Sequence, residues 1–202
     1  MGTILLVFLA AILIVPILLG LYVMGVYNYF VTLKQRVANA FSQIEIQLKR
    51  RHDLIPNLVE IAKGYMSHER ETLEAVINAR NQAVSGLSAA SGSVGDHDAM
   101  MTLAAAEKNL SGSLGRLFAL AEAYPDLKAN QNMMQLTEEL TTTENKISFA
   151  RQAYNDSVTT YNIYRESFPS NVIGSFFNVP ANYDLLEFDK EAIAESPKIS
   201  FN

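Results

Sequence analysis

The most constraining feature of this sequence is an apolar run near its start, Thr3 to Tyr27, which contains no Asp, Glu, Lys, Arg or His. The first charged side chain of the chain is Lys34. A helix rises about 1.5 Å per residue and the hydrocarbon core of a bilayer is about 30 Å thick, so roughly 20 apolar residues cross it. No other stretch is comparably apolar. Residues 1–27 are therefore predicted to form the transmembrane anchor of a single-pass protein.

A cleaved signal peptide is the main alternative for this run. Such peptides have a basic start, a shorter apolar stretch and a small-residue cleavage site. Here no Lys or Arg precedes the run, and the segment YVMGVYN at its end offers no such site. A buried core helix is the other alternative, but no other segment is apolar enough to surround it. We therefore favour an anchor that stays in the protein.

The orientation follows from the basic residues beside the anchor. Only the N-terminal amine lies before it, whereas Lys34 and Arg36 follow closely. The positive-inside rule predicts a short outside N-terminus and a cytoplasmic domain at the bacterial inner membrane. The opposite orientation, with the domain on the periplasmic or extracellular side, stays open as the alternative.

Composition limits the remaining chain to a few classes. The net charge is -5, which argues against nucleic acid because phosphate binding needs a cationic surface. The chain has no Cys, so disulfides, thiolate zinc sites and Cys nucleophiles are excluded. The segment beyond the anchor is long enough for one domain with its own apolar core.

Residues 28–168 show helical periodicity and predict an antiparallel four-helix bundle with coiled-coil-like packing. In the first helix, Asn28 to His52, one apolar stripe is formed by Val37, Phe41, Ile44 and Leu48. Asp53 is a good N-cap and Pro56 suits a first helical turn, so we favour a tight turn near His52. One long helix kinked at Pro56 remains the alternative, because no Gly separates the two segments.

Two later segments complete the predicted bundle. The Gly- and Ser-rich stretch from Ser85 to Asp98 predicts a loop, with Asp96 or Asp98 capping a third helix that runs to Tyr124. The last helix, Asp126 to Phe168, has the strongest repeat of the soluble part. Its members recur at steps of three and four: Met133, Leu136, Leu140, Thr143, Ile147, Ala150, Tyr154, Ser157, Tyr161, Tyr164 and Phe168. This repeat is typical of a coiled-coil or bundle seam.

The tail, residues 169–202, has no helical repeat but is unusually apolar for a tail. Its candidate interaction residues are aromatic: Phe176, Phe177, Tyr183 and Phe188. Since disordered segments are normally less apolar, we expect the tail to pack on the bundle, on the membrane surface or on a neighbouring subunit.

No motif of an enzyme or of a cofactor site occurs. The sequence lacks G-x-S-x-G, P-loop and G-x-G-x-x-G patterns. His68-Glu69 lacks the second His of the H-E-x-x-H motif, and no Glu-x-x-His pair suits a di-iron bundle. We therefore expect no catalytic residue, no cofactor and no metal, in a protein that is not an enzyme.

Charged residues on the first and last helices allow two interpretations. The favoured one is a solvated face with surface ion pairs. The other is a polar network between helices that fixes the register of the bundle and is structural rather than catalytic. Its candidate members are Arg50, Arg51, Asp53, Glu144, Arg151 and Asp156.

Two long runs resemble the signature of the LemA family of bacterial membrane proteins. They are YNYFVTLKQRVANAFSQIEIQLKRRHDLIPNLVEIAKGYMSHE and YPDLKANQNMMQLTEELTTTENKISFARQAYNDSVTTYN, the latter followed by FP. The resemblance extends in order from Asn28 to Pro169. It implies an N-terminal anchor followed by an antiparallel four-helix bundle, and it supplies no catalytic residues. The family includes magnetosome-membrane proteins, and many relatives carry a lipoprotein Cys that places their bundle outside the cytoplasm.

Together these features predict a non-enzymatic scaffold or assembly protein that self-associates at the membrane and organises or shapes it. The expected partners are the lipid bilayer and further copies of the chain in a homo-oligomer, with no nucleic acid. The alternative is a membrane-tethered receptor or adaptor. It would hold another membrane protein or a small ligand in a crevice lined by Tyr154, Tyr161 and Tyr164.

Overall fold

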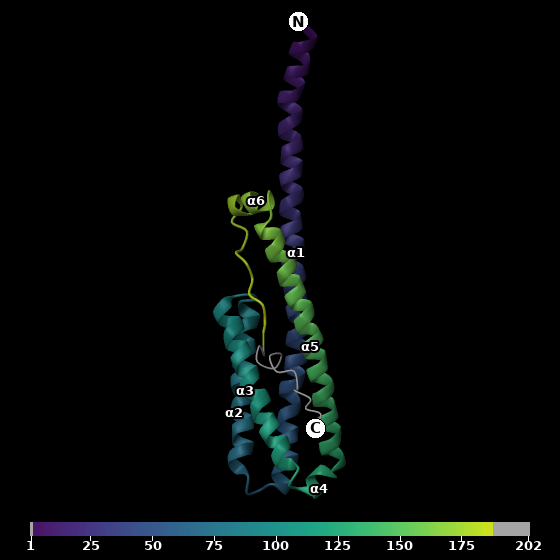
Figure 1. Cartoon of the computed structure of the whole chain (residues 1–202), viewed down its shortest axis with the longest axis vertical. Helices are drawn as coiled ribbons and strands as arrows, with labels where there is room; N and C mark the ends of the chain where they lie inside the picture. The colour runs from purple at the N-terminus through teal and green to yellow at the C-terminus, as the bar shows by residue number, and fades with distance from the viewer. Residues whose placement is uncertain (1, 188–202) are drawn as a thin grey trace, which may run out of the picture.

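The computed structural model describes residues 2–187, except for the side chains of residues 2–8 and 11. Its elements are α1 (Gly2–Tyr65), α2 (Arg70–Gly92), α3 (His97–Ala121), α4 (Pro125–Lys128), α5 (Gln131–Glu166) and α6 (Ser170–Phe176). The long helices α1, α2, α3 and α5 run up and down beside one another (Figure 1). The predicted all-α fold, with a long N-terminal helix continuing into a four-helix bundle, is confirmed.

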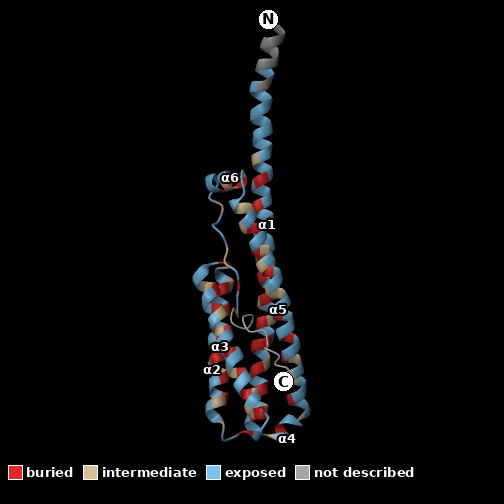
Figure 2. Cartoon of the chain, viewed as in Figure 1, coloured by how far each residue is buried: buried red, intermediate tan, exposed pale blue. Residues whose placement is uncertain are grey.

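Helix α1 belongs to two environments. Its N-terminal part projects beyond the bundle with exposed apolar side chains as far as Met24, and from Val26 onwards it lines the core (Figure 2). Within the described residues it is the one helix that is long and apolar enough to cross a membrane. A rigid rod therefore joins the candidate span directly to the bundle.

The favoured turn near His52 is wrong, and the alternative of one long helix is correct. Helix α1 continues through Pro56 to Tyr65, and the chain reverses only between Met66 and Glu69. The apolar stripe explains why, because Leu48, Ile55, Leu58 and Ala62 stay in helical phase and are all fully buried. Packing along this stripe outweighs the local preference of Asp53 and Pro56 for a helix start.

The predicted loop from Ser85 to Asp98 is mostly helix. Helix α2 extends to Gly92, and its small residues allow it to approach α3 closely. A Cβ atom on Gly86 would lie 3.3 Å from the Cα atom of Leu103. The Gly- and Ser-rich composition therefore marks a tight helix contact rather than a loop. The cap prediction is confirmed for Asp96, whose side chain accepts a hydrogen bond from the Ala99 amide at 3.1 Å.

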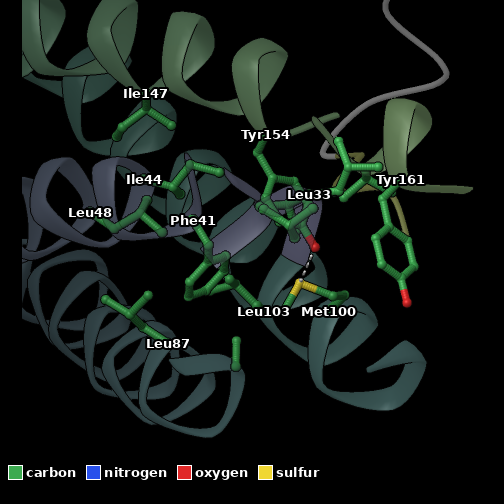
Figure 3. Packing of buried hydrophobic residues seen from close by; sticks show 14 of the residues in the cluster. Leu33, Phe41, Ile44, Leu48, Leu87, Met100, Leu103, Ile147, Tyr154 and Tyr161 are labelled. Atoms are coloured by element: carbon green, nitrogen blue, oxygen red, sulfur yellow. Dashed lines mark hydrogen bonds between the residues drawn. The ribbon is translucent and has the colours of Figure 1, made fainter. Parts of the chain in front are cut away.

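Two apolar clusters form the core along the bundle axis. The first cluster lies near the candidate span and centres on α1 and α5. There the ring centroids of Phe41 and Tyr154 are 5.8 Å apart (Figure 3). The second cluster lies at the far end and contains Ile55, Leu58 and Leu117. The α5 repeat faces inward, except that Phe168 lies beyond the helix and is 82% exposed. Between the clusters the buried side chains are polar.

Candidate functional site

A layer of polar side chains separates the two apolar clusters. Arg51 and His52 come from α1, Glu107 from α3 and Thr143 from α5, and all four are at most 5% exposed. Glu107 occupies a position of the α3 stripe that is otherwise apolar, between Leu103 and Leu110. Because an unpaired buried charge is costly, these side chains must satisfy one another.

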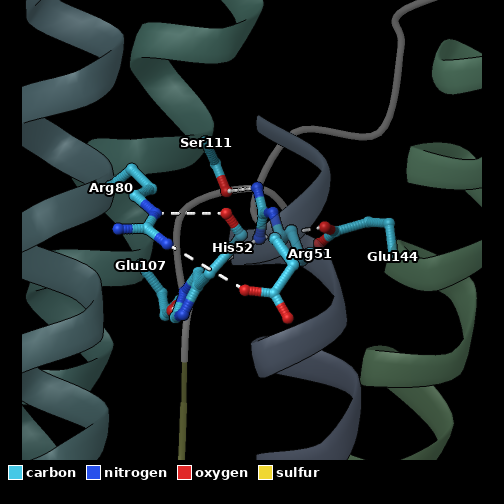
Figure 4. A network of polar contacts seen from close by, with 7 residues as sticks. Arg51, His52, Arg80, Glu107, Ser111 and Glu144 are labelled. Atoms are coloured by element: carbon cyan, nitrogen blue, oxygen red, sulfur yellow. Dashed lines mark hydrogen bonds and ion pairs between the residues drawn. The ribbon is translucent and has the colours of Figure 1, made fainter. Parts of the chain in front are cut away.

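The carboxylate of Glu107 contacts two neighbouring residues of α1. The Nη1 atom of Arg51 donates to its Oε2 atom at 3.3 Å, and the Nε2 atom of His52 lies 2.7 Å from its Oε1 atom. Arg51 also donates to Ser111 Oγ at 2.8 Å and forms an ion pair with Glu144 on α5 at 3.0 Å (Figure 4). A single guanidinium thus links α1, α3 and α5.

Arg80 on α2 completes the layer in a different way. Its Nε atom donates to the main-chain carbonyl of His52 at 3.1 Å (Figure 4). In an unbroken helix that carbonyl would accept from the amide of residue 56, but Pro56 has no N–H group. Arg80 therefore replaces the hydrogen bond that Pro56 removes from α1. This contact is a second reason why α1 continues through the proline.

The structure brings three of the six predicted network residues into ion pairs. Arg51 and Glu144 pair directly, and Asp53 lies 4.0 Å from Arg80. Arg50 and Asp156 are exposed and Arg151 is half-buried. The central members, His52 and Glu107, were missed by the sequence analysis. Their signal was present, because both interrupt an apolar stripe at a position that packing would reserve for an apolar residue.

The carboxylate and the imidazole at the centre of the polar layer are shielded from water. Glu107 and His52 are only 1% and 2% exposed. A neighbouring cavity of about 250 Å³ runs between α1 and α2, bordered by His52, Arg80 and Ser91. In residues 2–187 no three His, Asp or Glu side chains gather closely enough to hold a metal ion.

The part of the tail that follows α6 is held along α5 by two asparagines that are seven residues apart. Asn162 donates to the Tyr183 carbonyl at 2.9 Å and accepts from its amide at 3.0 Å. Asn155 contacts the carbonyl and amide of Leu186 in the same way, at 3.2 and 2.9 Å. Each amide side chain thus satisfies both main-chain groups of one tail residue, which fixes this segment along its length.

The buried tyrosines of α5 hold the same segment. Tyr161 Oη donates to the Pro180 carbonyl at 2.7 Å, and Tyr154 Oη donates to the Asp184 carbonyl at 3.1 Å. Burial raises the pKa of Tyr161 to about 12, and it also raises the pKa of Tyr154, where the charge of Asp184 adds to the effect. Both side chains are fully buried. The predicted crevice at these tyrosines is therefore filled by the chain itself.

The four predicted tail residues have different surroundings. Tyr183 contacts Tyr161 with tilted rings whose centroids are 4.6 Å apart, and it lies over Gly95, so it packs against the core. Phe176 is 81% exposed and Phe177 is 45% exposed, both beside the point where α1 leaves the bundle. Phe188 lies outside the described residues.

Comparison with known proteins places this architecture in a family. Magnetosome protein MamQ 2 of Paramagnetospirillum magneticum is 26% identical over 162 residues, which are 73% of this chain and 60% of that protein. MamQ of Magnetospirillum gryphiswaldense is 27% identical over 158 residues, 71% of this chain and 58% of the relative. Protein LemA of Metamycoplasma hominis is 27% identical over 140 residues, 69% of this chain and 59% of the relative. The chain thus spans less than two thirds of the length of these relatives. The sequence pattern of the LemA family matches residues 40–201, and the chain belongs to that family.

Proposed function

We propose that this protein is a non-enzymatic scaffold, anchored in the bacterial inner membrane by the first part of α1, that self-associates and organises or shapes the membrane. The observation that carries the proposal is the continuity of α1. One unbroken helix of 64 residues holds both the exposed apolar segment and a large part of the bundle core. Any lateral contact between bundles is therefore transmitted to the membrane without a flexible linker.

Anchoring also makes weak contacts between copies effective, because tethered partners meet at a high effective concentration. The outer surface of the bundle offers apolar side chains for such contacts. Phe149 on α5 is 74% exposed and Ile46 on α1 is 54% exposed. The rings of Phe41 on α1 and Tyr154 on α5 are in contact, and the two helices are antiparallel. Ile46 is five residues from Phe41 and Phe149 is five residues from Tyr154, both away from the span, so Ile46 and Phe149 lie at the same height.

Self-association is testable on the full chain in lipid nanodiscs or mild detergent by mass photometry. We expect particles larger than one chain, and a smaller mean mass for the double variant Ile46→Ser, Phe149→Ser. A matched control is Met101→Ser on α3, which is 61% exposed. A particle of one chain at every protein density up to that of a crowded membrane would refute the scaffold proposal.

The proposed orientation has the bundle in the cytoplasm, since the basic residues Lys34 and Arg36 follow the span closely. The chain has no Cys, so a single Cys in place of Met101, which is 61% exposed and lies outside the proposed contact, gives a clean probe. In intact cells a membrane-impermeant maleimide should leave this Cys unlabelled until the inner membrane is opened. Labelling in cells whose inner membrane is intact would reverse the orientation.

A receptor or adaptor is the second candidate function, and one groove favours it. It has a volume of about 550 Å³ at the far end of the bundle and lies between α3 and α5, with Phe118, Met133 and Met134 among its lining residues. Apolar walls with a few charges, here Glu122 and Lys128, suit a small ligand or a partner helix. A stoichiometric foreign protein that co-purifies with the wild type but is lost from Met134→Glu would support this function.

A further inference from the structure

The segment between α5 and the end of the described chain has an unusual composition. From Ser167 to Tyr183 no Asp, Glu, Lys, Arg or His occurs, although the preceding residue is Glu166 and the following one is Asp184. After the apolar N-terminal run, this is the longest stretch of the sequence without a charged or His side chain. Helix α6 lies inside this segment.

Helix α6 has one face that packs on the bundle. Ser170 is 3% exposed and its hydroxyl donates to the Tyr164 carbonyl at 2.8 Å. Gly174 lies directly against the ring of Phe30 on α1, where an added Cβ would approach the ring to 3.1 Å. Arg165 holds the helix from α5 by donating to the Asn171 carbonyl and to Ser175 Oγ, each at 3.3 Å. The orientation of α6 is therefore fixed.

The opposite face of α6 is apolar and uncovered. Val172 and Phe176, one helical turn apart, are 60% and 81% exposed, and Phe168 just before the helix is 82% exposed. We call these three residues the α6 face. Large aromatic side chains exposed to this degree on a fixed element are typical of an interaction surface.

The height of α6 along α1 indicates what this surface meets. The ring of Phe177 lies 5.4 Å from the ring of Tyr27, the last residue of the apolar run. The first charge on α1, Lys34, is seven residues further, about 10 Å along the helix. Helix α6 thus lies between the end of the span and the first charge, and it lies across the end of the bundle there (Figure 1). This is the level of the lipid headgroups, where aromatic side chains and short amphipathic helices are favoured.

We infer that the α6 face lies in the interfacial region of the bilayer, so that the protein contacts the membrane at a second place beside its anchor. The inference rests on the proposed membrane anchor. The second contact sets the tilt and the rotation of the bundle relative to the bilayer, which a single helix does not fix alone. Helix α6 is attached to α1 through Phe30 and to α5 through Arg165, so the whole bundle follows its position.

Depth measurement by fluorescence quenching tests the inference on the full chain, which has no Cys of its own. Single-Cys variants Val172→Cys and Phe176→Cys carry an environment-sensitive fluorophore, and the protein is reconstituted in phosphatidylcholine vesicles. Lipids with a nitroxide at a shallow or a deep position serve as quenchers. The matched control is Met101→Cys, 61% exposed on α3, where the preceding residue Met100 contacts Tyr154 of α5, about 21 Å further from the membrane than Phe168. Leu18→Cys reports the anchor itself.

We expect the shallow nitroxide to quench labels at 172 and 176 at least twofold more than the label at 101, and the deep nitroxide to quench the label at 18. If the label at 18 is quenched while labels at 172 and 176 behave like that at 101, the inference is wrong and the anchor stands. If the label at 18 is not quenched, the anchor proposal and the inference both fail. Excess lipid separates the copies of the chain from one another. If the fluorophore at 176 reports an apolar environment that is lost when excess lipid is added, the α6 face binds another copy of the chain, which also overturns the inference.

Discussion

Replacing Arg80 by Met tests how α1 passes through a proline. The substitution removes the donor that reaches the His52 carbonyl at 3.1 Å and leaves that carbonyl without a partner, because Pro56 has no amide hydrogen. A buried acceptor left unsatisfied costs about 1–3 kcal/mol. The pair of Arg80 with the exposed Asp53, at 4.0 Å, adds less than about 1 kcal/mol. We expect Arg80→Met to lower the free energy of unfolding by about 2 kcal/mol.

The same substitution should cost less when residue 56 is able to donate. Pro56 is exposed, so Pro56→Ala leaves the core unchanged and restores the main-chain hydrogen bond to His52. Ala is favoured over Pro in a helix interior by about 3 kcal/mol, so this variant should be more stable than the wild type. In the Pro56→Ala background we expect Arg80→Met to cost about 1 kcal/mol or less, since only the weak pair with Asp53 is then lost.

Denaturant unfolding of the full chain in detergent micelles measures this double-mutant cycle. Near-ultraviolet circular dichroism is a suitable signal, because Tyr154 and Tyr161 are fully buried in the bundle. Arg70→Met is the matched control: Arg70 lies on the same helix, is largely exposed and pairs with Glu74 at 2.7 Å. It should change stability by less than about 0.5 kcal/mol. An equal cost of Arg80→Met in the wild-type and Pro56→Ala backgrounds would refute the reasoning.

Three further predictions concern the polar layer and the tail. Glu107→Ala removes the acceptor shared by Arg51 and His52 and should lower the free energy of unfolding by about 3–5 kcal/mol in the same assay. Glu144→Ala, at a half-exposed site, should lower it by less than about 1 kcal/mol. Similar costs for the two substitutions would contradict a buried layer. Gly95→Ala forces a Cβ into the ring of Tyr183 and also strains a backbone with φ of 81°, so it should release residues 179–187 to limited proteolysis, while Gly92→Ala, which meets nothing within 4 Å, should not. The pKa of Tyr161 is raised to about 12 from 10.0, so its neutral form is favoured by folding: its contribution is complete below pH 10 and is lost as pH rises towards 12. Absorbance titration of the phenolate, compared with Tyr161→Phe, should show this, and ionisation of Tyr161 near pH 10 in the folded protein would refute it.

The sequence alone determined the features that depend on local chemistry. An uncharged apolar run from Thr3 to Tyr27 is suited to a membrane whatever follows it, and the repeat from Met133 to Tyr164 specifies a helix with one buried side. The cap of α3 was narrowed to Asp96 or Asp98, and Asp96 proved to be the cap, because capping involves only the next few residues. These signals lie within a few turns of each other along the chain, so the fold class was predictable.

The tertiary structure decided the features that depend on residues far apart in sequence. Whether Pro56 ends α1 depended on a donor 28 residues away from the carbonyl of His52, and whether Gly86 lies in a loop or in a helix contact depended on the closeness of α3. Likewise, the role of Tyr183 was set by Gly95 and Tyr161, neither of which is near it in the chain. Local preferences of this kind are worth about 1–3 kcal/mol, and the burial of a continuous apolar stripe or one well-placed hydrogen bond is enough to override them.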